Sequence, residues 1–408
     1  MDKIDLLTNE VKGSIDFFID YTNLISSSKG FGLTVDATKK PNIASIASVG
    51  FALSAWVIAH ARGYISSQQA LDITRGTLYT LCHNVSHFKG FFAHYLLMEN
   101  GERYRKCEYS TIDTSLCLNG VITAAAYFQD DEINQMARLL LDRVDWNWLV
   151  FEKDGKTFFR MAYNPDKGGD YVTHSPGFIS QWDMAAEQKM MYLQAAGAIN
   201  PCLAQKLYHG FSRDIGLYED QEIIINPGGT LFAYQFSEAW LDTQNYLDPE
   251  GVDWFTNTRL AALANRDFCI QHANEYKTYH ASSWGLSAGD SPRGYNVSGS
   301  TPCIGRASHN GTVSIWGALA SLPFTPEQTL DLALYLHNHH PQTIGPYGFY
   351  DAYNIDVSPA WYSKAIYGIN KGCSLIMIEN YLSRLIWETY TNSPYIQKSL
   401  AVLGFQKR

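Results

Sequence analysis

Helical periodicity recurs along most of this 408-residue chain and constrains its fold more than any other feature. Apolar residues return every three or four positions, the pattern of helices that bury one face. The predicted helices cover residues 3–26, 43–61, 66–83, 113–128, 131–146, 183–196, 200–212, 231–243, 252–273, 326–338, 359–366 and 370–391. Only Thr157–Ala162 and Glu222–Ile225 resemble strands, and neither alternates for long. Helices paired by short turns predict an all-α fold, an (α/α)6 toroid (barrel) with long loops shaping a central cleft. Periodicity alone also permits an α-solenoid or a large bundle.

Several predicted helices carry start signals. Ser66 precedes a helix as an N-cap residue would, Asp130 opens another, and Pro326 lies at a first turn. Between the helices, the longest stretches without helical periodicity are 274–325 and 341–358. Loops of this length in a compact protein are typically functional, so we expect part of the site there.

Composition narrows the function classes. The formal charge of −9 and the lack of a Lys/Arg-rich block argue against a nucleic-acid partner. No apolar run reaches the length of a membrane span, and the first residues lack the basic-then-apolar layout of a secretory signal. The seven cysteines are scattered, with no CxxC pair, which suits reduced thiols. We therefore expect a cytoplasmic protein forming a single domain over residues 1–408, although a secreted form whose signal has been removed stays open.

The segment Gly90–Phe128 gathers chemically capable side chains where a loop becomes a helix. Aromatic residues lead through a turn to Glu108, and Ser110, Thr111 and Asp113 follow at the start of a small-residue apolar helix. The hydroxyls suit helix capping, and both carboxylates suit the positive N-terminal end of a helix. Aromatic faces beside carboxylates also suit sugar rings, and for Glu108 we favour this functional interpretation.

Segments spread in order along nearly the whole chain carry a resemblance to a known group. They are Ala44–Gly50 with Ala59–Ile65, Gly90–Phe128, Trp182–Tyr192, Phe236–Asp242, Asn257–Ile270, Trp284–Tyr295, Leu319–Glu327, Gly345–Asn354 and Asn370–Trp387. The chain resembles the glucoamylase-like glycoside hydrolases that include bacterial β-1,2-glucanases. This resemblance implies an (α/α)6 enzyme acting on glycans, although fold alone does not fix the substrate. Two segments depart from the group: Trp182 to Glu187 keeps Trp and Glu but replaces Tyr and Asn between them, and Glu238-Ala239-Trp240 replaces His-Leu-Trp.

Two carboxyl groups usually cleave a glycosidic bond, one giving a proton to the leaving oxygen and the other acting as base or nucleophile. Glu187 lies among Trp, Met and Tyr residues, which disfavour its charged form and would raise its pKa, as a general acid requires. A helix-surface Glu beside Lys189 is the structural alternative. Glu108 and Asp351 are the candidates for the second role, and Asp351 could instead hold its own turn.

Other residues of the matched segments are predicted to bind substrate. They are Phe91, Phe92, His94, Tyr109, Asp113, Trp182, Glu238, Trp284, Asp290, Tyr350, Tyr353 and Asn354. Large rings are often core instead, and only the matched segments favour the cleft. His337, His339 and His340 cluster without Cys or carboxylate at metal spacing, so no metal and no cofactor is expected.

The sequence therefore predicts a hydrolase of β-glucosidic bonds, first of all in β-1,2-glucan or its oligosaccharides, with that sugar as its partner. A transglycosylase using the same groove is the first alternative, because relatives of the group move glucan chains. A glycan-binding protein without turnover is the second alternative.

Overall fold

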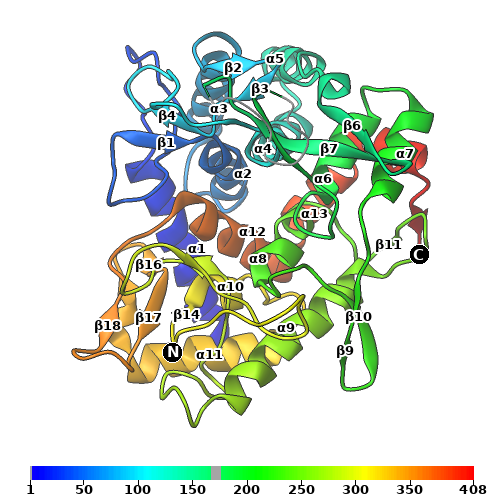
Figure 1. The fold of residues 1–408 in the computed structure, drawn as a ribbon. Helices are drawn as coiled ribbons and strands as arrows, with labels where there is room; N and C mark the ends of the chain where they lie inside the picture. Colours follow the sequence, from blue (N-terminus) through cyan, green and yellow to red (C-terminus); the bar gives the residue numbers. More distant parts are fainter. Residues whose placement is uncertain (1, 167–175) are drawn as a thin grey trace.

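The computed structural model describes residues 2–166 and 176–408. Its α-helices are α1 (Lys3–Asp20), α2 (Ile46–Ala61), α3 (Ser67–His83), α4 (Thr111–Phe128), α5 (Asp131–Asp142), α6 (Lys189–Ala196), α7 (Pro201–Gly210), α8 (Leu231–Gln235), α9 (Trp254–Gln271), α10 (Ile315–Leu319), α11 (Pro326–His339), α12 (Gly368–Ser383), α13 (Leu385–Thr391) and α14 (Pro394–Leu403). Short 3₁₀ turns are η1 (Trp146–Leu149), η2 (Ser237–Ala239) and η3 (Pro341–Thr343). Helices dominate the chain (Figure 1), which confirms the helical prediction in its coarse form.

The helices form an inner and an outer set. Inner helices α2, α4 and α12 are buried on almost every side, as the lack of a polar face in their sequences requires. Outer helices such as α3, α5 and α7 bury one face and expose the other. α2 packs against both α4 and α12 near the centre of the molecule (Figure 1).

Glycines set the close approach of α2 and α4. A Cβ on Gly50 would lie 2.2 Å from the Leu116 carbonyl oxygen, and one on Gly120 would lie 2.1 Å from the Gly50 carbonyl oxygen. Neither backbone oxygen can move aside within a helix, so only glycine lets the two helices cross at this distance. The apolar, glycine-containing sequences of both helices thus explain their central position.

The strands are short, antiparallel and attached to loops. Pairs are formed by β1 (Ile43–Ser45) with β4 (Tyr95–Leu97), β2 (His87–Phe88) with β3 (Phe91–Phe92), β9 (Ile215–Tyr218) with β10 (Gln221–Ile224), β11 (Tyr246–Leu247) with β19 (Gln406–Lys407), β12 (Ala288–Gly289) with β13 (Asn296–Val297), and β15 (Ile344–Gly345) with β16 (Gly348–Phe349). Larger sheets join β5 (Tyr109–Ser110), β6 (Val150–Lys153), β7 (Lys156–Tyr163) and β8 (Phe178–Gln181), and β14 (Val313–Ser314), β17 (Ala352–Asn354) and β18 (Trp361–Tyr362). The two predicted strands are confirmed as β7 and β10, and the described residues form no closed sheet.

Several predicted helices are corrected by the structure. Residues 359–366 form no helix, because Trp361 and Tyr362 pair with β17 as strand β18. The first helix ends at Asp20, since the chain then turns and Thr22 bridges Thr34. Helices α10 and α14 were not expected. The capping predictions are confirmed, with a capping box at Ser66 and an N-cap at Asp130.

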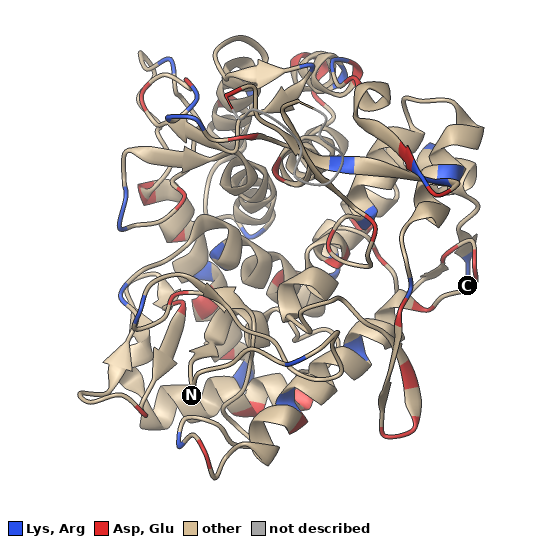
Figure 2. Ribbon diagram, in the orientation of Figure 1, with Lys and Arg blue, Asp and Glu red and all other residues tan. Residues whose placement is uncertain are grey.

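Charge is distributed over the whole fold. Lys and Arg are interspersed with Asp and Glu along the ribbon, and no element in this view is a continuous basic stripe (Figure 2). Among the described helices, none combines the length and the apolar character that a bilayer span would need. The seven cysteines all lie in the described ranges and none is in a disulfide.

Candidate active site

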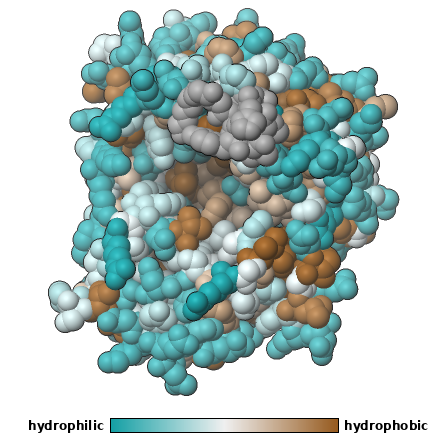
Figure 3. Space-filling model, viewed as in Figure 1, coloured by the Kyte–Doolittle hydropathy of each residue, from teal (hydrophilic) through white to brown (hydrophobic). Residues whose placement is uncertain are grey.

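Several of the predicted site residues lie in segments that precede buried helices. The His94 carbonyl oxygen accepts a hydrogen bond from the first amide of α2, and the Asp351 carbonyl oxygen accepts one from the first amide of α10. Glu108 lies two residues before Ser110, the N-cap of α4. Glu187 lies two residues before Lys189, the first residue of α6. The face shown in Figure 3 is hollowed near its centre, over the part of the view where Figure 1 places α2 and α4. Backbone contacts to helix starts thus bring sequence-distant loops to one side of the inner helices.

His94 is held between two carboxylates. Its Nδ1 lies 2.7 Å from Oε1 of Glu108, and its Nε2 lies 3.6 Å from Oδ2 of Asp113. The ring also stacks on Tyr95, with 3.9 Å between centroids. Burial lowers the pKa of His94, but the charges of Asp113 and Glu108 outweigh it and raise the pKa to about 9. His94 is therefore an imidazolium at neutral pH and ties the loop before β4 to the start of α4.

This pairing predicts a pH-dependent contribution of His94 to stability. The folded-state pKa of His94, about 9, lies above the ordinary value of 6.5, so the stabilisation is complete below about pH 6.5 and disappears as the pH rises through about 9. A His94→Gln variant should differ most from the parent in free energy of unfolding at about pH 6, and least at about pH 10. Urea unfolding at several pH values measures this difference, and a difference that stays constant over the range would contradict the ion-paired arrangement.

The start of α4 shows which hydroxyls are structural. Ser110 is the N-cap: its Oγ accepts the Asp113 amide at 3.2 Å and donates to Asp113 Oδ2 at 2.5 Å. The Thr111 hydroxyl donates to the Met161 carbonyl oxygen and accepts from Trp182 Nε1 at 3.0 Å. The capping prediction for Ser110 is confirmed, and Trp182, 6 % exposed, is a buried support of this corner.

Glu187 is partly exposed and otherwise surrounded by protein. Burial, followed by the negative charge of Asp113, raises its pKa to about 7, while its own backbone amide and Lys189 act in the opposite direction. The predicted direction of this shift is confirmed. Met190 and Tyr192, which suggested the apolar setting, point into the core. A carboxyl group that keeps a proton near neutrality and still meets solvent can donate that proton to a bound molecule.

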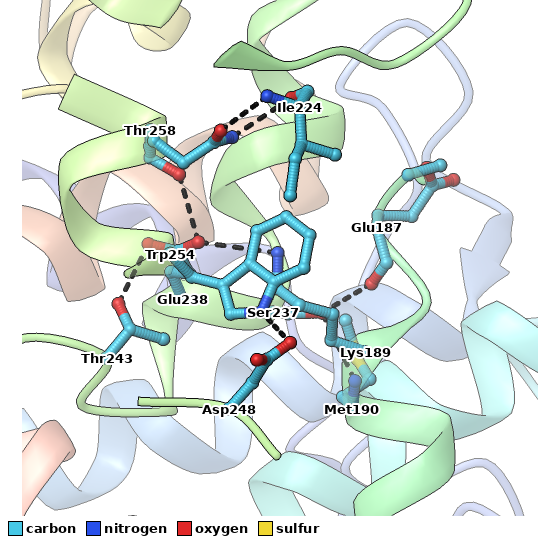
Figure 4. A network of polar contacts seen from close by, with 12 residues as sticks. Glu187, Lys189, Met190, Ile224, Ser237, Glu238, Thr243, Asp248, Trp254 and Thr258 are labelled. Atoms are coloured by element: carbon cyan, nitrogen blue, oxygen red, sulfur yellow. Dashed lines mark hydrogen bonds and ion pairs between the residues drawn. The ribbon is translucent and has the colours of Figure 1, made fainter. Parts of the chain in front are cut away.

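Glu238 is placed elsewhere than predicted. Its side chain has no exposed surface and accepts hydrogen bonds from Thr258 at 2.9 Å and Thr243 at 3.0 Å (Figure 4). The Lys189 ammonium group lies 3.3 Å from Oε1 of Glu238. The prediction that Glu238 contacts substrate is wrong in this structure, because its oxygens face buried protein donors.

Asp290 and Asp351 form a second polar cluster. Asp351 Oδ1 accepts from the Asn370 side chain at 2.7 Å, and Oδ2 accepts from the Asp290 backbone amide at 2.6 Å. Burial raises the pKa of Asp351 to about 7, and the negative charge of Asp290 acts in the same direction. The two hydrogen bonds lower this pKa, but their effect is smaller than that of burial. The Asp290 carboxylate is itself held by Lys39 at 2.7 Å and by the Ser363 hydroxyl at 2.6 Å. Asp351 is 4 % exposed, and it supports the Asp290 loop through its hydrogen bond with the Asp290 backbone amide.

Most of the predicted stacking rings belong to the core. Phe91 and Phe92 are each 1 % exposed, and Trp284 and Tyr353 have no exposed surface. These four rings offer no free face to a sugar in this structure, which favours the core role over the predicted substrate contacts. The Asn354 amide is likewise buried and donates to Asn310 and Thr312.

Tyr109 and Tyr350 keep partial exposure. The Arg103 guanidinium lies 5.0 Å from the Tyr109 ring centroid, and the Lys364 ammonium group lies 4.6 Å from that of Tyr350. Both rings therefore have one face occupied by a cation and retain some surface for a ligand.

Three residues close to the predicted site residues escaped the sequence interpretation. The first, Asp36, is partly exposed. Its partial burial and the negative charge of Asp113 raise the pKa of its carboxyl group, whereas the charge of His94 lowers that pKa. Tyr295 is 47 % exposed and its ring lies 4.9 Å from that of Tyr367. Enclosure by protein raises the pKa of Tyr295, and the charges of Asp351 and Asp36 act in the same direction. Asp36, Tyr295 and Tyr367 thus link the His94 cluster to the Asp290 cluster. Asp36 gave no helix-start signal that could have identified it.

Metal binding has little support in the described ranges. There, no three His, Cys, Asp or Glu side chains converge as metal ligands would. His340 instead contacts the hydroxyls of Tyr335 and Tyr362, and His339 contacts the Tyr335 carbonyl oxygen.

Known proteins resemble this chain in sequence and in fold. Residues 179–394 match the glycoamylase family, described as "Putative glucoamylase". An exo-β-1,2-glucooligosaccharide sophorohydrolase (non-reducing end) of Parabacteroides distasonis is 27 % identical over 389 residues, which cover 86 % of this chain and 52 % of that protein. The chain thus spans about half the length of the curated relative it matches.

Solved structures share the whole fold. A Bacteroides uniformis protein that carries the same description as the family superposes with a TM-score of 0.85 at 24 % identity, covering 100 % of this chain and 98 % of the other. An endo-β-1,2-glucanase of Chitinophaga pinensis, solved with sophorotriose and glucose, gives 0.84 at 24 % identity and covers 100 % and 99 %. At these identities the likeness establishes the fold.

Proposed function

The chain belongs to the glycoamylase family, and on that premise we propose that it is a glycoside hydrolase of β-1,2-linked glucose oligosaccharides or glucan. Two relatives in the comparisons are described as acting on β-1,2-linked glucose. The observation that carries the proposal is Glu187: a carboxyl group with a pKa of about 7, partly exposed, at the start of a buried helix. This is the form in which a carboxylic acid protonates a leaving glycosidic oxygen.

We further propose that residues 1–408 form a single (α/α)6 toroid. The division into buried inner helices and half-exposed outer helices supports this architecture, as do the glucoamylase-like neighbours. In such a toroid the loops preceding the inner helices surround one end of the barrel. The hollow of Figure 3 would then be the sugar cleft.

Glu108 and Asp351 are the candidates for the second carboxylate. Exposure favours Glu108, because its side chain is 33 % exposed and a base or nucleophile must meet water or the sugar. Asp351 is buried and has a hydrogen-bond donor on each oxygen. Glu108→Ala and Asp351→Ala, assayed with and without sodium azide, separate the two roles. Azide should restore turnover and give a glycosyl azide only in Glu108→Ala; rescue of Asp351→Ala instead would transfer the role to Asp351.

The substrate proposal is tested with a panel of glucans. Linear β-1,2-glucan and its oligosaccharides should release shorter sugars, whereas β-1,3-, β-1,4- and β-1,6-glucans should be cleaved far more slowly. Chromatography of the products gives their lengths, and longer or cyclic products would mean that sugar replaces water as acceptor. If purified, folded protein releases no sugar from any glucan, hydrolysis is excluded.

A further inference from the structure

The backbone that carries Glu187 is fastened to η2. The Ser237 hydroxyl donates to the Glu187 carbonyl oxygen at 2.5 Å and accepts from the Met190 amide at 3.2 Å (Figure 4). Ser237 is 1 % exposed. The Ser237 side chain thus bridges Glu187, two residues before α6, and the first turn of that helix, and it fixes where the Glu187 side chain begins.

A buried ion pair lies beside this bridge. Lys189 and Glu238 are 4 % and 0 % exposed at their side chains, and their charged groups are 3.3 Å apart. Trp254 covers the Lys189 ammonium group, which lies 4.2 Å from the ring centroid, and Trp254 Nε1 donates to Asp248 at 3.0 Å. Burial lowers the pKa of Lys189 and raises that of Glu238, and the attraction between the two opposes both shifts. The cation is therefore held two residues from Glu187, away from screening by salt.

We propose that Ser237, Lys189 and Glu238 are positioning residues for Glu187: the Ser237 hydroxyl and the buried Lys189–Glu238 ion pair fasten the start of α6 to η2 and so fix where the Glu187 side chain begins. The inference rests on the function proposed above. Two charged side chains act on Glu187, Asp113 at the start of α4 and Lys189 at the start of α6. Asp113 favours the neutral form and Lys189 the ionised form. The charge of Glu238 favours the protonated form of Lys189, and this form opposes the increase in the Glu187 pKa that burial causes.

Simple structural stabilisation is the alternative explanation. Replacing a whole buried ion pair by uncharged residues is often neutral or stabilising, so stability alone gives little reason for this pair. A merely structural pair would leave the titration of Glu187 unchanged when both charges are removed together. The titration midpoint therefore distinguishes the two explanations.

The first experiment uses Ser237→Ala, which removes one hydroxyl and leaves all charges in place. We expect kcat on β-1,2-gluco-oligosaccharides to fall by roughly 10-fold with KM little changed, because a displaced acid loses alignment with the glycosidic oxygen. Ser399→Ala is the matched control, since Ser399 is equally buried and donates to a carbonyl oxygen within α14. Equal kcat values for Ser237→Ala and the parent would overturn the positioning role of Ser237.

The second experiment removes the pair with Lys189→Met/Glu238→Gln. Without the cation, the Glu187 titration should move to higher pH, and the alkaline limb of kcat/KM should follow. Carbon-13 NMR of labelled glutamate side chains, assigned with Glu187→Gln, reads this midpoint without any activity. Lys371→Met/Glu10→Gln, which removes another buried pair, should leave it in place. If the Glu187 titration midpoint is the same in Lys189→Met/Glu238→Gln and in the parent, the inference is overturned. If the midpoint moves but the parent protein cleaves no glucan, only the proposed function is refuted.

Discussion

Replacing Glu187 with Gln is expected to lower kcat/KM on β-1,2-gluco-oligosaccharides by about 10²–10⁴-fold while the protein stays folded. The amide keeps the size of the side chain and removes the proton that the leaving oxygen needs. Because the pKa of Glu187 is raised to about 7, the parent should lose activity as the pH rises above about 7. That alkaline limb should be absent from the residual activity of the variant. Steady-state kinetics across pH, with thermal unfolding for integrity, measures both effects.

Two controls show whether residue 187 acts as the acid. Glu222→Gln alters an exposed glutamate in β10 and should leave the kinetics unchanged. A dinitrophenyl glycoside of the same sugar needs no proton on its leaving group, so Glu187→Gln should cleave it much closer to the parent rate. Equal losses on the activated and natural substrates would mean that Glu187 binds sugar and does not protonate it.

Replacing Lys371 with Met is expected to lower the free energy of unfolding by about 3–5 kcal/mol, because it leaves the Glu10 carboxylate buried without its cation. Lys371 and Glu10 are 4 % and 3 % exposed at their side chains and 2.7 Å apart. Glu10 also accepts the Phe349 amide at 2.7 Å, and Lys371 donates to the Phe349 carbonyl oxygen at the same distance. The pair thus fastens the loop that carries Asp351 between α1 and α12.

The double variant Glu10→Gln/Lys371→Met is the control for this stability effect. Removing both charges leaves no unpaired ion, so most of the loss should be recovered. Urea unfolding of the parent and the three variants gives the coupling free energy. A loss below about 1 kcal/mol in Lys371→Met, or no recovery in the double variant, would show that the pair does not stabilise this loop.

The sequence predicts helices well where local chemistry and packing agree. Ser66 and Asp130 cap their helices as expected, and the predicted helix over residues 43–61 is present as α2. Residues 359–366 were mistaken for a helix because their apolar spacing also suits β18, and pairing with β17 decided between the two. Helix α14 was missed although Ser393 and Pro394 supply an N-cap and a first-turn proline.

The site was only partly predictable, for a different reason. The raised pKa of Glu187 could be predicted because its neighbours in the sequence already indicate an apolar setting. The sequence could not distinguish Glu238 from a carboxylate that faces substrate. Its partner Lys189 lies in another segment, and the sequence does not show that the two segments pack together. Asp36 and Tyr295 were missed because their enclosure depends on how distant loops meet. The aromatic rings were overassigned because composition does not distinguish a core ring from a stacking face.

A crystal structure of Glu187→Gln with a β-1,2-gluco-oligosaccharide tests the central claim most directly. We predict that the sugar occupies the hollow of Figure 3 with one glycosidic oxygen within about 3.2 Å of the residue 187 amide, and with the Glu108 carboxylate on the other side of that bond. A sugar bound away from residue 187, in a well-folded crystal, would contradict the account.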